Sequence, residues 1–305
     1  MKREEIRQVL NALAERRPAA MSRTVDGKEY VRRFLPEERL ILLGAGHVSQ
    51  ATAKLAHMVG FSVTVVDDRP DFANYERFPD ADEILCTGFT EALEQLKITP
   101  ADYVCTLTRG HRHDALCVRY VLSHAEPYYL GMIGSRHRVS EFFEVLRQEG
   151  YPEEKIASVH APIGLPIRAL TREEIGISIV AQLVQEKRRP MPEGPASYLL
   201  QTDLDMETLQ YLAEGTDPCA VITVLSSEGS TPAKPGAMMT VDRIGAIHGT
   251  VGGGCSEAEL MTKARRLIGT GGREVIEINM TNEVAEENGM VCGGHMWALA
   301  EDVTE

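Results

Sequence analysis

The sequence lacks several features that mark specialised protein classes. No window offers the roughly 18 uncharged apolar residues that a membrane-spanning helix requires, and no two cysteines are spaced as CxxC. An excess of basic charge is also absent, because the formal net charge is −13. The summed field of such a chain repels phosphate backbones and anionic lipid. We therefore expect neither a membrane segment nor a nucleic-acid partner.

The cysteines do not form the dense pattern of secreted disulfide-rich domains. The opening run MKREEIRQVLNALAERRP is a charged amphipathic helix and has no apolar centre of the kind found in secretory signals. We therefore expect a cytoplasmic protein with free thiols. The six cysteines are Cys86, Cys105, Cys117, Cys219, Cys255 and Cys292.

The length of 305 residues, with 43% hydrophobic and 25% charged residues, predicts two soluble globular domains. A run with three prolines, KRRPMPEGPAS, breaks both helical and strand periodicity and is typical of a linker. We expect four segments. They are an N-terminal helix and hairpin packed on the first domain (1–38), the first domain (39–187), the linker (188–200) and the second domain (201–305).

The first domain alternates short apolar strands with helical segments from Arg39 onward, a pattern that predicts parallel βαβ units. Its last helix has a capping box of Thr171 and Glu174. The second domain mixes strands and helices with several glycine-rich loops. The expected fold class is therefore α/β, with a Rossmann-like parallel sheet domain followed by a smaller α+β domain.

A dinucleotide-type turn follows the first strand of the Rossmann-like domain. The strand RLILL runs into Gly44, Ala45, Gly46 and His47, where two glycines permit a tight turn and close approach of a pyrophosphate to a helix N-terminus. Asp67 ends the second strand about 20 residues later, where an acid accepts hydrogen bonds from a ribose diol. The alternative is that the glycines only connect strand to helix, since this fold alone implies no function.

Two further loops are expected at the same carboxyl edge of the sheet. The loop after the fourth strand carries Arg109 and His111, and the loop after the fifth carries Gly134 and Arg136. Open α/β folds place their ligands at this edge, so these side chains are candidate donors to an anion. Half-exposed surface histidines remain the alternative.

The second domain presents cysteines framed by glycines. Gly252, Gly253 and Gly254 precede Cys255, which stands where a helix begins, with Ser256 and Glu259 as an expected capping box. Unpaired amides at a helix N-terminus lower the pKa of a thiol, so we expect a reactive thiolate at Cys255. Cys292 in VCGG is a second candidate, although free cysteine often packs simply as a small hydrophobe.

Several runs resemble one family. GSTPAKPGAMMTV, GTVGGGCSEAEL and GMVCGGHMWAL are similar to the XdhC/CoxI domain, and ILLGAGHVSQ, TRGHRHD and HAPIGLPIRALTREEIGISIVAQL resemble the Rossmann domain of XdhC proteins. The resemblance extends from Leu40 to the end of the chain. The order differs from fused members in which the XdhC/CoxI domain comes first.

The resemblance implies a maturation factor that binds the molybdenum cofactor (molybdopterin), promotes its sulfuration with a cysteine desulfurase, and delivers it to a xanthine dehydrogenase-type molybdenum hydroxylase apoenzyme. Cys255 matches the reactive position of the family and is expected to be a ligand of molybdenum, and Cys292 would assist. The glycine turn at Gly44 would bind a nucleotide such as NAD or another dinucleotide. A homodimer is expected, and an accessory protein is favoured over a stand-alone enzyme. The alternative function is an NAD-dependent oxidoreductase acting on a small substrate.

Overall fold

The structure is a computed structural model of residues 1–305, which form two compact units. It describes every residue except 190–195, 200–205, 230, 232–233, 254 and 280–293. The side chains of residues 196, 198, 255 and 256 are also outside the described part. One unit comprises Pro36–Pro190. The other comprises Met1–Leu35 together with Met191–Glu305.

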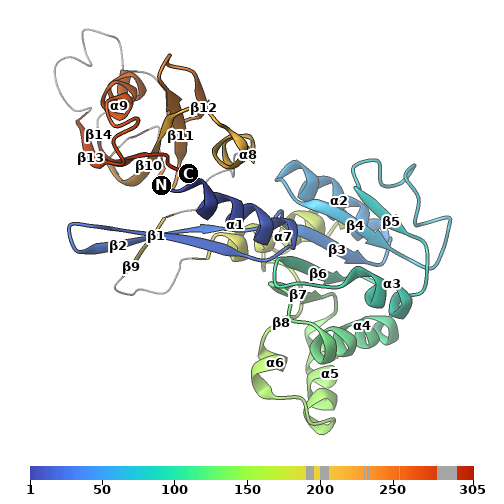
Figure 1. The fold of residues 1–305 in the computed structure, drawn as a ribbon. Coiled ribbons are helices and arrows are strands. Elements are labelled where there is room, and N and C mark those ends of the chain that lie inside the picture. Colours follow the sequence, from blue (N-terminus) through green and yellow to red (C-terminus); the bar gives the residue numbers. More distant parts are fainter. Residues whose placement is uncertain (190–195, 200–205, 230, 232–233, 254, 280–293) are drawn as a thin grey trace. The chain divides into compact units, whose positions relative to one another are not determined.

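The unit Pro36–Pro190 is built on a six-stranded parallel sheet with strand order β5-β4-β3-β6-β7-β8 (Figure 1). Counted from the start of this unit, the order is 3-2-1-4-5-6, which is that of dinucleotide-binding Rossmann folds. The expected α/β fold class is therefore confirmed. The strands are β3 (Arg39–Leu43), β4 (Ser62–Val66), β5 (Glu83–Leu85), β6 (Asp102–Thr106), β7 (Tyr129–Met132) and β8 (Val159–His160).

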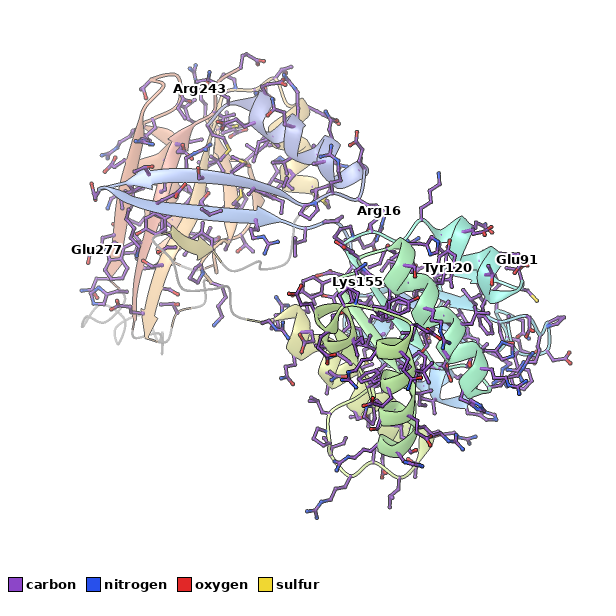
Figure 2. All side chains as sticks on the ribbon, turned by 90° about the horizontal axis from the view of Figure 1, so that it is seen from below. Arg16, Glu91, Tyr120, Lys155, Arg243 and Glu277 are labelled. Atoms are coloured by element: carbon purple, nitrogen blue, oxygen red, sulfur yellow. The ribbon has the colours of Figure 1, made fainter. Side chains whose placement is uncertain are left out.

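Helices cover both faces of this sheet, which is why its strands are apolar on both sides. One face packs on α2 and α7, and the other packs on α3, α4, α5 and α6. Lys155, which is labelled in Figure 2, connects α6 to α4 through a 2.7 Å hydrogen bond to the carbonyl oxygen of Leu122. The helices are α2 (His47–Met58), α3 (Phe89–Leu96), α4 (His111–His124), α5 (Arg136–Gln148), α6 (Glu153–Ala157) and α7 (Arg172–Lys187).

The direction of chain winding reverses between β3 and β6, which are neighbours in the sheet. The chain leaves β3 toward β4 and β5 on one side and returns to β6 and β7 on the other. In sheets of this kind the loops on the two sides diverge at the carboxyl ends of the strands, and ligands bind where they diverge. The glycine turn after β3 and the loop after β6 both lie at this point.

The second unit contains a five-stranded antiparallel sheet of order β12-β11-β10-β14-β13 and a three-stranded sheet of order β1-β2-β9. The hairpin β1–β2 turns at Asp26 and Gly27, both with positive φ, as the sequence predicts. The strands are β1 (Ala19–Val25), β2 (Lys28–Phe34), β9 (Ala196–Leu199), β10 (Cys219–Gly229), β11 (Met238–Asp242), β12 (Ile247–Gly249), β13 (Arg273–Asn279) and β14 (Gly294–Asp302).

Both faces of the five-stranded sheet are covered. Helix α9 (Cys255–Arg265) buries Leu260 and Ala264 against one face. The other face contacts α1 (Arg3–Ala14), α8 (Met206–Glu214) and the hairpin sheet through an apolar cluster that includes Ile6 and Leu209. This unit therefore has a three-layer core of its own.

The N-terminal segment belongs to this second unit, which corrects the expectation that residues 1–38 pack on the Rossmann-like domain. Ile6 is fully buried in the cluster with Leu209. Arg3 donates hydrogen bonds to the carbonyl oxygens of Leu212 (2.9 Å) and Asp217 (2.7 Å). The hairpin pairs with β9 in the three-stranded sheet of the same unit. The amphipathic pattern of α1 predicts a buried face but does not say which domain supplies the partner.

Among the helices that the structure describes, none has both the length and the apolar character needed to cross a membrane.

Replacing Ile6 by Ala tests this assignment of the N-terminal helix. Loss of a fully buried side chain costs about 2–5 kcal/mol, and the loss falls on the unit that holds α8 and β10. Hydrogen exchange followed by mass spectrometry is expected to show faster exchange in α8 and β10 and unchanged exchange in β3 and β4. Ile177→Ala, at a half-exposed position of α7, is the matched control. Faster exchange in β3 would contradict the assignment.

Candidate functional site

The glycine turn after β3 closes tightly against the neighbouring loop. Gly44 adopts a φ of +113°, and a Cβ atom added there would overlap the backbone carbonyl of Leu107 after β6. Only glycine fits this position. Gly46 has ordinary φ and nothing within 4 Å of an added Cβ, so the space in front of it is open. The backbone at Gly44 is therefore packed against its neighbours, whereas the backbone at Gly46, just before α2, is accessible to a ligand.

Asp67 is buried, with 1% exposure, at the carboxyl end of β4. One carboxylate oxygen accepts the amide of Ala45 at 2.8 Å, and the Arg69 guanidinium binds both oxygens at 2.8 and 2.9 Å. Burial opposes ionisation, but hydrogen bonds from Arg69 and Ala45 outweigh it and lower the pKa of Asp67. The position matches the prediction from sequence. A ribose would have to take the place of Arg69, so the ribose-binding role stays a prediction.

Arg109 reaches across the carboxyl end of β3 to the loop after β4. Its guanidinium binds the Asp68 carboxylate in a two-pronged ion pair with distances of 2.6 and 2.9 Å. Strand β3 lies between β4 and β6 in the sheet, so this ion pair connects the loops on either side of the glycine turn. Arg109 is thus at the expected edge, but its donors are engaged by the chain's own acid.

The remaining predicted donors lie at the same edge and are exposed. His47, His111 and Arg136 are the first residues of α2, α4 and α5. Gly134 precedes the N-cap residue of α5. Arg136 lines an open depression beside α5, whereas no contact joins it to Arg109 or His111 in the described part of the chain. The structure places these residues along one edge without bringing them into a single cluster.

Asp114 in the first turn of α4 is a further buried titratable group near this edge of the sheet. It is 4% exposed, and its Oδ1 accepts the amide of Thr108 at 2.9 Å. Burial raises the pKa of Asp114 to about 6, against hydrogen bonds from Thr108 that act in the opposite direction. The signal in the sequence is an acid in the first turn of a helix that follows a buried strand.

The glycine loop before α9 holds its amides around one oxygen. Gly252 and Gly253 have φ values of +112° and +77°. The Oε1 atom of Glu257 accepts the amides of Val251 (2.9 Å) and Gly253 (2.8 Å) and the hydroxyl of Thr250 (2.6 Å). A negatively charged oxygen therefore occupies the nest that these amides form. A phosphate or oxo-anion oxygen has the same chemistry and would fit the same donors.

The expected cysteine site is described in part. The backbone of Cys255 begins α9, as the sequence predicts, while its side chain lies outside the described residues. Gly254 and Cys292 also lie outside them. The side chain of Ser256, one half of the expected capping box, lies outside the described residues as well. Glu259 pairs with Lys263 at 2.8 Å, and Glu257 turns back to the loop. Among described residues, no group of three or more histidine, cysteine or acidic side chains could hold a metal.

Strand register brings the loops of this unit to one end of its sheet. Gly229 at the end of β10 pairs with Gly294 at the start of β14, and Asn279 at the end of β13 pairs with His295. His295 stacks on Trp297 at 5.8 Å and lies 3.5 Å from Glu277, which is labelled on β13 in Figure 2. Sequence reasoning missed this histidine, although it stands three residues after Cys292.

Two sequence families match the chain in succession. The pattern of the XdhC Rossmann domain matches residues 40–183, and that of the XdhC and CoxI family matches residues 212–279. The chain belongs to the XdhC and CoxI family. The Rossmann domain comes first and the XdhC/CoxI domain second, as the sequence resemblance predicts.

Three curated relatives match about half of this chain. The uncharacterized protein YqeB of Escherichia coli (strain K12) is 39% identical, with 49% of this chain and 27% of the relative covered. A probable xanthine dehydrogenase subunit of Bacillus subtilis (strain 168) is 32% identical, with 52% and 46% covered. The molybdenum cofactor insertion chaperone PaoD of Escherichia coli (strain K12) is 24% identical, with 49% and 40% covered. The chain thus spans less than half the length of each relative.

A solved structure is also similar in sequence. It is described as a xanthine dehydrogenase from Bacillus halodurans and is 34% identical to this chain. The match covers 55% of this chain and 48% of that one, with a TM-score of 0.47.

Asp114→Asn is expected to change how stability depends on pH. The folded pKa of about 6 exceeds that of an unfolded aspartate, so the contribution of this carboxyl to the stability of the wild type is greatest below about pH 4 and is lost as the pH rises to about 6. Asparagine still accepts the Thr108 amide and carries no charge. From pH 4 to 7 the variant should therefore gain about 2 kcal/mol over the wild type.

Urea unfolding measured at several pH values checks this expectation. Asp71→Asn, an exposed carboxyl in the same unit, is the control and should follow the wild type. Parallel pH profiles for Asp114→Asn and the wild type would show that burial does not raise the pKa of Asp114.

Proposed function

We propose that this chain is a maturation factor for a xanthine dehydrogenase-type molybdenum hydroxylase. It binds the molybdenum cofactor as cargo, supports its sulfuration by a cysteine desulfurase, and delivers it to the apoenzyme. Membership of the XdhC and CoxI family and the likeness to a relative named as a molybdenum cofactor insertion chaperone support this proposal. The likeness to a relative named as part of a probable xanthine dehydrogenase suggests the class of client.

The observation that carries the proposal is the amide nest directly before Cys255. The Val251 and Gly253 amides already converge on a single anionic oxygen, and Cys255 begins the helix that follows. A pterin phosphate or an oxo ligand would meet the amides in place of Glu257. The thiolate of Cys255, stabilised by the helix N-terminus, would bind molybdenum or accept sulfur, and thiolates are suited to such soft centres.

The Rossmann-like unit binds a nucleotide in this proposal. The open approach at Gly46, the strand order and the acid at the end of β4 support it. The nucleotide is the dinucleotide form of the cofactor or a separate regulatory dinucleotide such as NAD. Two copies of the chain would act together, and the protein would work in the cytoplasm with the desulfurase and the apoenzyme.

The alternative is an NAD-dependent oxidoreductase that transfers hydride to a small substrate. It would use the Rossmann-like crevice but would leave the amide nest before Cys255 without a role. Assays of the purified protein with NAD and small alcohol or acid substrates distinguish the two. Turnover without any added hydroxylase would favour the oxidoreductase.

Cys255→Ser is expected to abolish maturation of the client. Serine keeps the size of the side chain but supplies no thiolate, so a coexpressed hydroxylase should contain at least about tenfold less sulfurated molybdenum. The measurement is the cyanide-releasable sulfur and the molybdenum content of the purified hydroxylase. Cys86→Ser, which removes an exposed cysteine of the other unit, is the matched control. Normal sulfur content with Cys255→Ser would refute the proposed role of this thiol.

Gly46→Ala is expected to block the nucleotide without disturbing the fold. An added Cβ at Gly46 meets no protein atom, yet it would stand where a pyrophosphate approaches the backbone. Isothermal titration with ADP-ribose, NAD and FAD should show binding weakened by roughly tenfold or more and an unchanged unfolding temperature. If the wild type binds none of these at millimolar concentration, the proposal of a separate regulatory dinucleotide such as NAD is refuted.

A further inference from the structure

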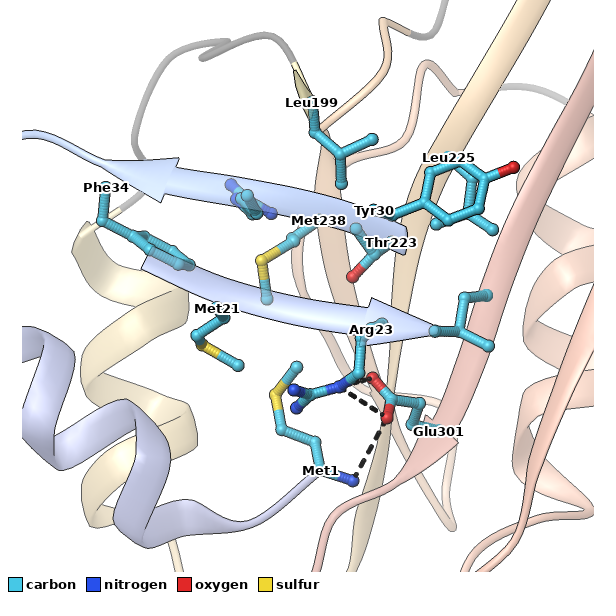
Figure 3. A pocket seen from close by; sticks show the side chains of 12 residues that line it. Met1, Met21, Arg23, Tyr30, Phe34, Leu199, Thr223, Leu225, Met238 and Glu301 are labelled. Atoms are coloured by element: carbon cyan, nitrogen blue, oxygen red, sulfur yellow. Dashed lines mark hydrogen bonds and ion pairs between the residues drawn. The ribbon is translucent and has the colours of Figure 1, made fainter. Parts of the chain in front are cut away.

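A small cavity lies between the two sheets of the unit formed by Met1–Leu35 and Met191–Glu305 (Figure 3). The hairpin strands β1 and β2 and the strand β9 form one wall, and β10, β11 and β14 form the other. Most of the lining is apolar, with side chains such as Met21, Met238, Leu199 and Leu225. The free space is about 20 Å³. A single water needs roughly 10–15 Å³, so the cavity accepts one small guest.

Arg32 on β2 brings a positive charge into this lining. Its Nη1 atom is buried and has no hydrogen-bond partner, and no carboxylate of the described residues forms an ion pair with the guanidinium. The nearest interaction is with the ring of Phe34, whose centroid is 5.0 Å away. Burial lowers the pKa of Arg32 to about 10. The side chain therefore remains charged at neutral pH.

The other charges around the cavity neutralise one another. The Arg23 guanidinium binds Glu301 at 2.9 and 3.1 Å and Glu5 at 2.7 Å. The amino group of Met1 lies 3.7 Å from Glu301 (Figure 3). Two cations thus meet two carboxylates, and the charge of Arg32 is left over. No carboxylate among the described residues offsets the charge of Arg32, and an uncompensated buried charge destabilises a fold, so this position favours an anion.

We propose that this cavity is a binding site for one small monovalent anion of halide size, held beside Arg32 between the two sheets. The single excess charge calls for a single negative charge. The free volume excludes sulfate, phosphate and carboxylates with a chain. The apolar walls suit a weakly hydrated halide better than a strongly hydrated anion. The site is separate from the amide nest at Glu257 and does not depend on the proposed maturation function.

Bromide, which scatters X-rays anomalously, locates the anion directly. Crystals grown in sodium bromide are expected to show an anomalous difference peak within hydrogen-bond distance of the Arg32 guanidinium. Crystals of Arg32→Met are expected to lack it, while Arg32→Lys retains the charge and should retain the peak. A wild-type map with no peak beside Arg32 would overturn the proposal.

Thermal unfolding supplies a second measurement that needs no crystals. Each tenfold rise in chloride or bromide above the dissociation constant should raise the Tm of the wild type by roughly 3–5 °C. The response of Arg32→Met to the same halide salts controls for screening and general salt effects. Arg32→Met should lack the site-specific part of the rise, and Arg138→Met, an exposed arginine of the other unit, should keep it. Equal halide responses in the wild type and Arg32→Met would contradict the site.

Discussion

Carboxylates of the chain itself satisfy the backbone amides of its tight loops. Asp67 accepts the amide of Ala45, Asp114 accepts that of Thr108, and Glu257 accepts two amides of the glycine loop. The same pattern holds away from the candidate sites, where one oxygen of Asp302 accepts the amides of Gly269 and Gly271. Amides buried without acceptors are costly. These acids therefore fix the loop conformations on which both candidate sites depend.

This arrangement constrains how an anionic guest can bind. At the amide nest before α9, the guest has to displace the carboxylate of Glu257, which then becomes free to move into solvent. At the glycine turn, Asp67 and Asp68 already neutralise Arg69 and Arg109. Binding there replaces the hydrogen bonds between these side chains with hydrogen bonds to the guest. The net affinity therefore depends on the small difference between the free energies of these two sets of hydrogen bonds. Selectivity for a particular anion follows from geometry more than from total charge.

Local patterns predicted the Rossmann-like unit because each of its elements is specified by nearby residues. The strand before Gly44, the positive φ required there and the helix after it all lie within about 20 residues, as in the family fingerprint. The position of α1 could not be predicted in this way, since Ile6 packs against Leu209, far away in sequence. The role of Glu257 could not be predicted from the sequence, because it depends on the positive φ values of Gly252 and Gly253, which turn the loop amides toward its carboxylate.

The contacts of the N-terminal segment show that the two units do not simply follow one another along the chain. Residues before Pro36 complete the unit that contains the XdhC/CoxI domain, so the Rossmann-like unit is inserted into it instead of simply preceding it. The segments that flank the insertion pair directly, since β2 and β9 are neighbouring parallel strands with Glu29 opposite Ala196 and Arg32 opposite Leu199. An insertion leaves the core of the host intact when its flanking segments stay together. Each candidate site is therefore assembled from residues of one unit, and its chemistry does not require the order found in other family members.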